Sequence, residues 1–127
     1  MSIKVLYVDD DELNVELFKM VFKRHYIIIG AQNGEEALNT LRNNQDIQVV
    51  ISDMKMHEMS GLEFIMQAQK DFGDKDFYML TGYGATDDIL QAMEDGIIID
   101  CFTKPFDKKT IIDAIDLQNH LEASSLP

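Results

Sequence analysis

The chain has 127 residues, 46% of them hydrophobic, which suits one folded domain with a single core. It carries 11 basic and 23 acidic side chains, and its net charge of −12 disfavours direct binding to nucleic acid phosphates or anionic membrane surfaces. A bound cation or a basic partner is favoured instead. The apolar runs are too short for a transmembrane helix, and the acidic N-terminal segment is no secretory signal. The single cysteine, Cys101, excludes an internal disulfide and favours a reducing, cytoplasmic location.

Five short apolar runs, rich in β-branched and aromatic residues, are typical of β-strands. They span residues 5–8, 27–29, 49–51, 77–80 and 97–99. Their apolar character is continuous rather than alternating, which predicts strands that are covered on both faces of a sheet.

The segments between these runs have apolar residues at the spacing of one helix face. The expected stripes are Leu13, Leu17, Phe18, Val21 and Phe22; Ala37, Leu38 and Leu41; Leu62, Ile65 and Met66; Ile89, Ala92 and Met93; and Ile111, Ala114 and Ile115. Helix starts are indicated by Asp11 with Glu12, Asn33 with Glu36, Ser60 with Glu63, Thr86 and Asp107, and helix ends by Gly73 and Gly96. The repeated strand–helix order predicts a parallel α/β sheet with helices on both faces. We expect one domain over residues 1–122, with 123–127 as a C-terminal tail or the start of a linker.

Polar side chains follow four of the five predicted strands, where ligands bind in open α/β sheets. These segments are Asp9-Asp10-Asp11, Ser52-Asp53, Thr81-Gly82 and Thr103-Lys104-Pro105. Carboxylates from two strands would meet at one edge, and because like charges raise each other's pKa, something must neutralise them. Oxygen ligands suit Mg²⁺, while a lysine and a hydroxyl group can bind phosphoryl oxygens. The sequence therefore predicts a phosphoryl site with a carboxylate nucleophile.

In order and in spacing, these motifs resemble the receiver domain of two-component response regulators (CheY-like). The resemblance covers nearly the whole chain. It rests on Asp9-Asp10, the DMKMHEMSG stretch from Asp53, the LTG around Thr81, the TKPF around Lys104 and the NGEEAL run from Asn33. It implies a flavodoxin-like fold, in which a five-stranded parallel sheet has the order 2-1-3-4-5 and five helices cover both faces.

The resemblance also implies a role for the acidic residues. Asp53 would accept a phosphoryl group from a phosphohistidine on a histidine kinase or phosphotransfer protein. Asp10, Asp53 and the backbone carbonyl of Lys55 would hold Mg²⁺, and Asp9 would act through a metal-bound water. The protein would then be a signalling switch whose only chemistry is its own phosphorylation and dephosphorylation, not an enzyme acting on a substrate.

Further residues would act on the phosphoryl group once it is bound. By the resemblance, Lys104 would pair with its oxygens and Thr81 would hydrogen-bond to the phosphorylated form. The positions two beyond the acceptor and two beyond the threonine border the phosphoryl group in this family. They are Lys55 and Tyr83 here, and we expect these large side chains to slow its hydrolysis.

Three features depart from the family pattern. His57 stands where proline is usual, and Cys101 where the family usually has the aromatic residue that follows the threonine inward. The segment from Gly96 to Lys104 is also one residue longer than usual. Phe102 cannot simply replace the missing aromatic residue, because adjacent residues of a strand point to opposite faces. We therefore expect that the phosphorylation chemistry is retained and that the usual threonine–aromatic switch is altered.

The resemblance implies that the partners are the phosphodonor protein and a downstream output domain or protein. It also implies a homodimer through the face made by the fourth helix, fifth strand and fifth helix, near residues 86–118. A pseudo-receiver, which signals without phosphate, is the alternative that Cys101 and His57 motivate. The three histidines, His25, His57 and His120, lack metal-ligand spacing, so we expect structural or surface roles for them.

Two further functions fit the sequence less well. A Mg²⁺-dependent phosphohydrolase would need a DxDx[TV] motif after the first strand, where this chain reads DDDEL, and a cap for which the chain leaves no room. A flavodoxin-type FMN carrier would need a Ser/Thr/Gly phosphate loop in the same place, where this chain has three aspartates.

Overall fold

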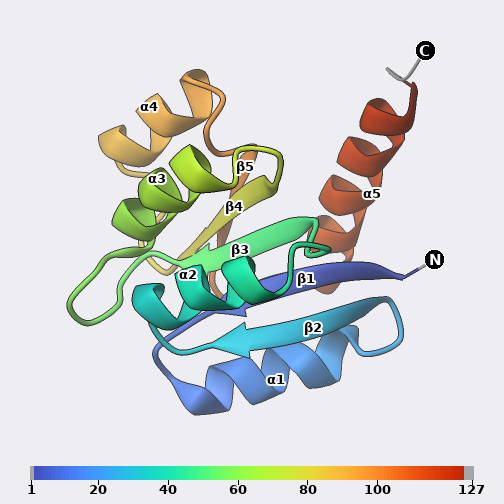
Figure 1. Ribbon diagram of the computed structural model, residues 1–127, viewed down its shortest axis with the longest axis horizontal. Helices are drawn as coiled ribbons and strands as arrows, with labels where there is room; N and C mark the ends of the chain where they lie inside the picture. The colour runs from blue at the N-terminus through green and yellow to red at the C-terminus, as the bar shows by residue number, and fades with distance from the viewer. Residues whose placement is uncertain (1, 125–127) are drawn as a thin grey trace.

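The computed structural model describes residues 2–124 and shows a five-stranded sheet in the order β2-β1-β3-β4-β5 (Figure 1). The strands are β1 (Ile3–Val8), β2 (Tyr26–Ala31), β3 (Val49–Asp53), β4 (Asp76–Thr81) and β5 (Asp100–Thr103). Every neighbouring pair is parallel. The predicted fold class and strand order are therefore confirmed.

Helices cover both faces of this sheet. Within the described residues they are α1 (Glu12–Phe22), α2 (Gly34–Asn43), α3 (Gly61–Asp71), α4 (Asp87–Glu94) and α5 (Lys108–Ser124). One core cluster joins the sheet to α2, α3 and α4 and includes Phe64, while the other joins it to α1 and α5 and includes Phe18. Neighbouring strand residues alternate between the clusters: Leu6 belongs to the first and Tyr7 to the second. Burial on both faces explains why the strands read as continuous apolar runs.

The fifth strand lies later in the chain than we predicted. The apolar run at residues 97–99 was expected to form it, but β5 begins at Asp100. Gly96 turns the chain with a φ of 76°, and the backbone N–H groups of Ile97 and Ile98 then donate to the carbonyl of Ala92, at 2.9 and 3.2 Å. These two residues close the end of α4, so their N–H groups cannot pair with β4. Ile98 is buried in the core, whereas Ile99 is 36% exposed.

The predicted apolar stripe of the first helix is partly wrong. Phe18 and Phe22 are buried, but Leu13 is 67% and Leu17 is 47% exposed. The helix carries two apolar stripes, and the one that faces the sheet is Val15, Phe18 and Phe22. The aromatic stripe packs inward because Phe18 stacks on the ring of Tyr7, with centroids 3.9 Å apart.

The helix boundaries agree with the capping residues in the sequence. Ser60 and Glu63 form a complete capping box at the start of α3. Asn33 and Thr86 cap α2 and α4 through their side chains, and Asp11 caps α1 in the same way. The carboxylate of Asp107 accepts from the N–H of Thr110 at the start of α5.

The structure describes only the first two residues of the predicted C-terminal tail. α5 continues to Ser124, so residues 123 and 124 extend the helix, and residues 125–127 of the predicted tail lie outside the described residues. The domain boundary at residue 122 stays a prediction. None of the helices within residues 2–124 is long and apolar enough to cross a membrane.

Candidate functional site

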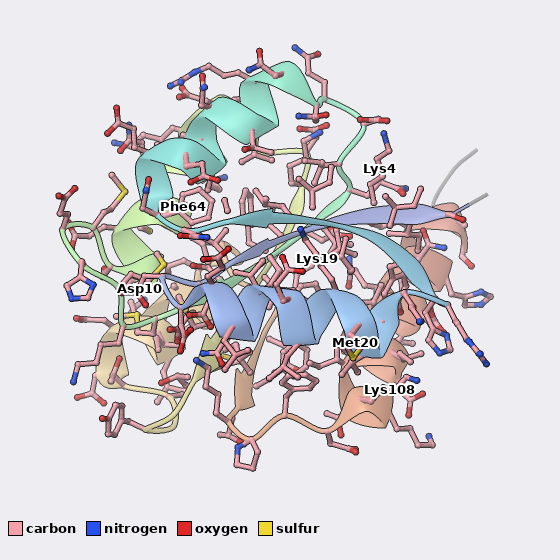
Figure 2. The ribbon with its side chains drawn as sticks, turned by 90° about the horizontal axis from the view of Figure 1, so that it is seen from below. Lys4, Asp10, Lys19, Met20, Phe64 and Lys108 are labelled. Atoms are coloured by element: carbon pink, nitrogen blue, oxygen red, sulfur yellow. The ribbon has the colours of Figure 1, made fainter. Side chains whose placement is uncertain are left out.

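Three carboxylates meet at the carboxyl end of the sheet. Asp9 and Asp10 follow β1, and Asp53 is the last residue of β3, which pairs with β1. One carboxylate oxygen from each residue lies within 4.8 Å of the others. Asp9 and Asp53 are buried, whereas Asp10 is partly exposed at the end of β1 opposite Lys4 (Figure 2). The carboxylates that we expected to meet at one edge of the sheet do so.

Lys104 provides the positive charge of this cluster. Its Nζ lies 3.2 Å from Oδ1 of Asp53 and 3.4 Å from Oδ2 of Asp9. Lys104 follows β5, and its backbone N–H donates to the carbonyl of Thr81 at 2.8 Å, which fixes the loop beside β4. Burial alone would lower the pKa of Lys104, but the charges of Asp53 and Asp9 outweigh this effect and raise it. The lysine is therefore a permanent cation in the site.

The pKa of Asp53 is raised, mainly by burial. The attraction of Lys104 opposes this rise, and the nearby charge of Asp9 adds to it. The three carboxylates carry more negative charge than one ammonium group can neutralise. A divalent cation with oxygen ligands would remove the excess, so the donor set fits Mg²⁺.

Tyr7 holds Asp9 in place and is a site residue that our sequence reading missed. Its hydroxyl donates to Oδ2 of Asp9 at 2.8 Å, and the N–H of Asp11 donates to Oδ1 at 3.0 Å. Burial and the charge of Asp9 raise the pKa of Tyr7, so the hydroxyl stays a donor. The only signal in the sequence is that residues 7 and 9 lie on the same side of an extended chain. We read Tyr7 as part of an apolar run.

Thr81 ends β4 beside the carboxylates. It is buried, and its Oγ1 accepts from the backbone N–H of Tyr83 at 3.2 Å. Within residues 2–124, no hydrogen bond joins its hydroxyl to the three acids. Tyr83 itself is 80% exposed, and its ring centroid lies 5.2 Å from Nζ of Lys55. The two residues expected to border the phosphoryl group are thus in contact with each other.

The loop between β3 and α3 brings its backbone close to Asp53. The N–H of Gly61 donates to the carbonyl of Met54 at 2.8 Å. A Cβ at position 61 would lie 2.1 Å from the carbonyl oxygen of Asp53, so only glycine fits there. In the same loop the Nδ1 atom of His57 lies 2.7 Å from Oδ2 of Asp10. We predicted only a structural or surface role for His57, whose side chain is 95% exposed, and did not foresee this contact.

Cys101 and Phe102 lie on opposite faces of β5, as expected from their adjacency. Cys101 pairs in register with Met79 and packs on the α2–α3–α4 side. Phe102 is buried on the other side, where its ring stacks on Tyr78 with centroids 5.5 Å apart. Burial raises the pKa of the Cys101 thiol. The remaining histidines, His25 and His120, are exposed and lie apart from the acidic cluster.

Comparison with known proteins places this chain in one family. The response regulator receiver domain family matches residues 5–116. The transcriptional regulatory protein GlrR of Escherichia coli is 33% identical over 113 residues, which are 88% of this chain but 25% of that protein. A chemotaxis protein CheY homolog of Campylobacter jejuni is 30% identical over 117 residues and covers 89% of both chains.

A solved structure agrees with these sequence relatives. The response regulator receiver domain protein from Clostridium thermocellum has a TM-score of 0.89 and 25% sequence identity, and the match covers 98% of this chain and 99% of that one. The chain therefore belongs to the receiver domains of two-component response regulators. Receiver domains are signalling switches rather than enzymes with separate substrates, and our identification from the motifs is confirmed. The roles of the individual residues stay predictions.

Proposed function

We propose that the chain accepts a phosphoryl group on Asp53 from a phosphohistidine of a histidine kinase or phosphotransfer protein. The observation that carries this proposal is the meeting of Asp9, Asp10 and Asp53 with Lys104 at one sheet edge. A carboxylate oxygen of Asp53 forms a bond to phosphorus while the phosphorus–nitrogen bond breaks, and the electron pair of that bond returns to the imidazole. Lys104 stabilises the ionised carboxylate before the reaction and the added phosphoryl oxygens after it.

The reaction depends on Mg²⁺ in this proposal. Asp10, Asp53 and the backbone carbonyl of Lys55 would hold the ion, and Asp9 would act through a water. When bound, the ion would neutralise charge on the phosphoryl oxygens. The burial of Asp9 and its donors Tyr7, Asp11 and Lys104 suit a fixed acceptor that orients a water.

The phosphorylated form is recognised by Thr81 and Lys104. Among residues 2–124 the hydroxyl of Thr81 bonds only to the backbone N–H of Tyr83, so a small movement frees it to donate to a phosphoryl oxygen. The usual aromatic partner of this threonine is replaced by Cys101, and Phe102 is buried on the opposite face. We propose that the switch therefore works without a swinging aromatic ring. Lys55 and Tyr83 cover the phosphoryl group and slow its hydrolysis.

The partners of the switch are the phosphodonor protein and an output domain or protein. Exposed apolar side chains on α4, on α5 and just before β5 support docking or homodimer formation through residues 86–118. They include Leu90 at 51%, Ile99 at 36% and Leu117 at 60% exposure. The chain matches only 25% of the length of GlrR, so any activity of a longer protein is outside this proposal. A cytoplasmic location, and the absence of nucleic acid or membrane binding by this domain, stay predictions from the sequence.

A pseudo-receiver is the second candidate. His57 in the place of the usual proline and Cys101 in the place of the usual aromatic residue favour it. The arrangement of Asp53 beside Lys104 favours phosphorylation instead, because a pseudo-receiver has no need of an ion pair at that position.

Intact mass distinguishes the two. The protein is incubated with Mg²⁺ and acetyl phosphate, beside an Asp53→Asn variant and an Asp74→Asn control at the opposite end of the sheet. We expect the wild type and the control to gain one phosphoryl group and Asp53→Asn to gain none. No gain by a wild type whose circular dichroism shows a folded chain would favour the pseudo-receiver.

A further inference from the structure

The three carboxylates of the site differ in how firmly the protein holds them. The side chain of Asp9 is 1% exposed, and both of its oxygens accept hydrogen bonds. The side chain of Asp53 is 10% exposed and pairs with Lys104. Asp10 is the most open of the three, with a side chain that is 24% exposed. Among the described residues its carboxylate has one partner, His57.

His57 binds Asp10 at two points. Its backbone N–H donates to Oδ2 of Asp10 at 3.1 Å, and its ring Nδ1 lies 2.7 Å from the same oxygen. An ionised carboxylate only accepts hydrogen bonds, so Nδ1 carries the proton in this contact. Within residues 2–124 the other oxygen, Oδ1, accepts no hydrogen bond. The two donors therefore fix the carboxylate through Oδ2 and leave Oδ1 for another ligand.

We propose that His57 is a positioning residue, which holds Asp10 so that Oδ1 faces the divalent cation. This inference rests on the proposed Mg²⁺ site. His57 is not itself a ligand, because among the histidine, cysteine and acidic side chains of residues 2–124 the cluster of mutually close ligand atoms contains only Asp9, Asp10 and Asp53. Hydrogen bonds from outside the ligand shell orient metal-binding carboxylates, and their loss weakens metal binding. Because the His57 ring is 95% exposed, water competes for this bond, and the effect should lie at or below the lower limit, about 10-fold, of the usual range.

Three substitutions at position 57 separate the effect of the hydrogen-bond donor on the ring from the effect of the size of the ring. His57→Asn keeps the backbone N–H and has a side-chain N–H that can reach Oδ2. His57→Phe keeps a planar ring without a donor, and His57→Ala removes the ring. The Mg²⁺ dissociation constant of the unphosphorylated proteins is measured by titration calorimetry. We expect Ala and Phe to weaken binding about 3- to 10-fold and Asn to stay within about twofold of the wild type.

The dependence of phosphorylation on Mg²⁺ provides the second measurement. At low Mg²⁺ the Ala variant should react with acetyl phosphate more slowly than the wild type, and saturating Mg²⁺ should restore its rate. A structural role of His57 would not give this rescue. Equal Mg²⁺ affinities across the series, or weak binding by Asn and Phe alike, would overturn the inference.

The outcomes separate this inference from the proposed function. If the wild type binds Mg²⁺ and gains a phosphoryl group but all His57 variants bind Mg²⁺ with the same dissociation constant, only the role of His57 fails. If the wild type binds Mg²⁺ with the expected His57 dependence but Asp53 gains no phosphoryl group, only the proposed function fails. If the wild type does not bind Mg²⁺, and Asp10→Asn behaves as the wild type does, both fail.

Discussion

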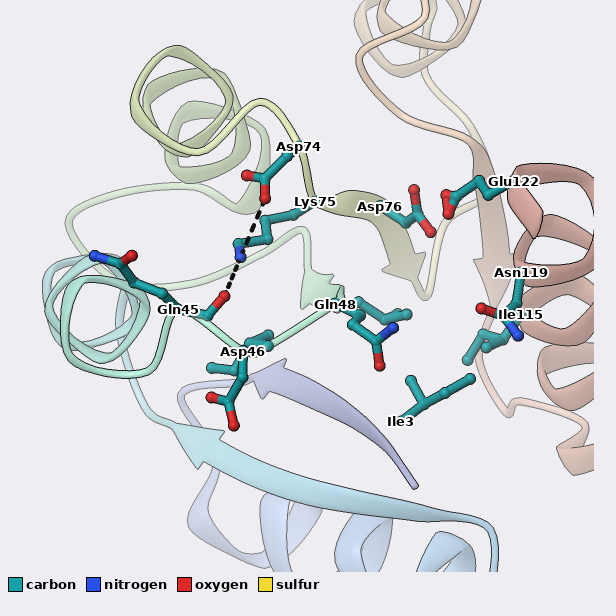
Figure 3. A pocket seen from close by; sticks show the side chains of 12 residues that line it. Ile3, Gln45, Asp46, Gln48, Asp74, Lys75, Asp76, Ile115, Asn119 and Glu122 are labelled. Atoms are coloured by element: carbon teal, nitrogen blue, oxygen red, sulfur yellow. Dashed lines mark hydrogen bonds and ion pairs between the residues drawn. The ribbon is translucent and has the colours of Figure 1, made fainter. Parts of the chain in front are cut away.

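A pair of carboxyl groups at the amino end of the sheet should make the stability of this protein depend on pH near neutrality. Asp76 begins β4, and its side chain faces that of Glu122 near the end of α5 (Figure 3). Both line a pocket of about 200 Å³. Burial raises the pKa of Asp76 to about 7, with added contributions from the hydrogen bond and the charge of Glu122. The lysine of this pocket, Lys75, bonds instead to the carbonyl of Gln45 at 2.6 Å.

The sign of the effect follows from the direction of this shift. The folded protein keeps a proton on Asp76 that the unfolded chain releases above about pH 4, so the free energy of unfolding falls as pH rises from about 4 to 7. A rise in pKa from 3.8 to about 7 corresponds to about 4 kcal/mol. Because Asp76 is only half-buried, water screens the interaction, and we expect about 1–2 kcal/mol.

Urea unfolding at pH 5 and pH 8 measures this contribution in the wild type and in Glu122→Gln. The glutamine can still donate a hydrogen bond to Asp76 but has no charge to oppose its ionisation. Burial, the largest cause of the raised pKa, is unchanged in the variant, so we expect it to lose less stability than the wild type between the two pH values by about 0.5–1 kcal/mol, roughly half of the wild-type effect. Glu94→Gln, at an exposed acid of α4, is the control and should follow the wild type. The raised pKa of Asp53 acts equally in all three proteins and cancels. Identical pH dependence in the wild type and Glu122→Gln would refute the reasoning.

Three further substitutions test the carboxyl end of the sheet. Gly61→Ala places a Cβ 2.1 Å from the carbonyl oxygen of Asp53, so urea unfolding should show a loss of about 1–3 kcal/mol; an unchanged midpoint would contradict the close approach. Tyr7→Phe removes a donor from buried Asp9 and should cost about 1–3 kcal/mol at pH 7, whereas a neutral result would mean that the Asp11 N–H and Lys104 are sufficient donors for Asp9. Tyr83→Ala should shorten the phosphoryl half-life, followed by intact mass; a wild-type half-life of seconds or less would count against a covering role.

The meeting of the acids was predictable because it depends on topology. Parallel strands end at one edge of the sheet, so residues that follow the neighbouring strands β1 and β3 lie close together, and the long side chain of Lys104 reaches them from β5 past the end of β4. Asp9, Asp10 and Asp53 each follow or end a short apolar run, and this pattern survives errors of one or two residues in the strand bounds. The identity of the fold followed from the same order of strands and helices.

Contacts that depend on side-chain direction were not predictable in this way. Tyr7 lies within an apolar run, and nothing in that run distinguishes a hydroxyl that reaches Asp9 from a ring that only packs. His57 lies in an irregular loop, where spacing along the chain does not fix which residue it meets. The fifth strand was misplaced for a related reason: Ile97 and Ile98 are as apolar as strand residues, but their N–H groups bond to the end of α4.

Each end of the sheet contains a carboxyl group whose pKa is raised by burial, and the surroundings of the two groups respond to this in different ways. At the carboxyl end, Lys104 lies 3.2 Å from Asp53 and opposes the rise in pKa that burial causes, so the acceptor is kept available as a carboxylate. At the amino end, no lysine or arginine within residues 2–124 pairs with Asp76, and burial together with the hydrogen bond and charge of Glu122 favours a proton on Asp76 instead. A carboxylate nucleophile needs the first arrangement, because a proton on the acceptor would block the bond to phosphorus. Removal of the lysine charge by Lys104→Met should therefore shift the pH dependence of Asp53 phosphorylation upward, in addition to slowing it. A slower reaction with an unchanged pH profile would mean that Lys104 acts on the phosphoryl group alone.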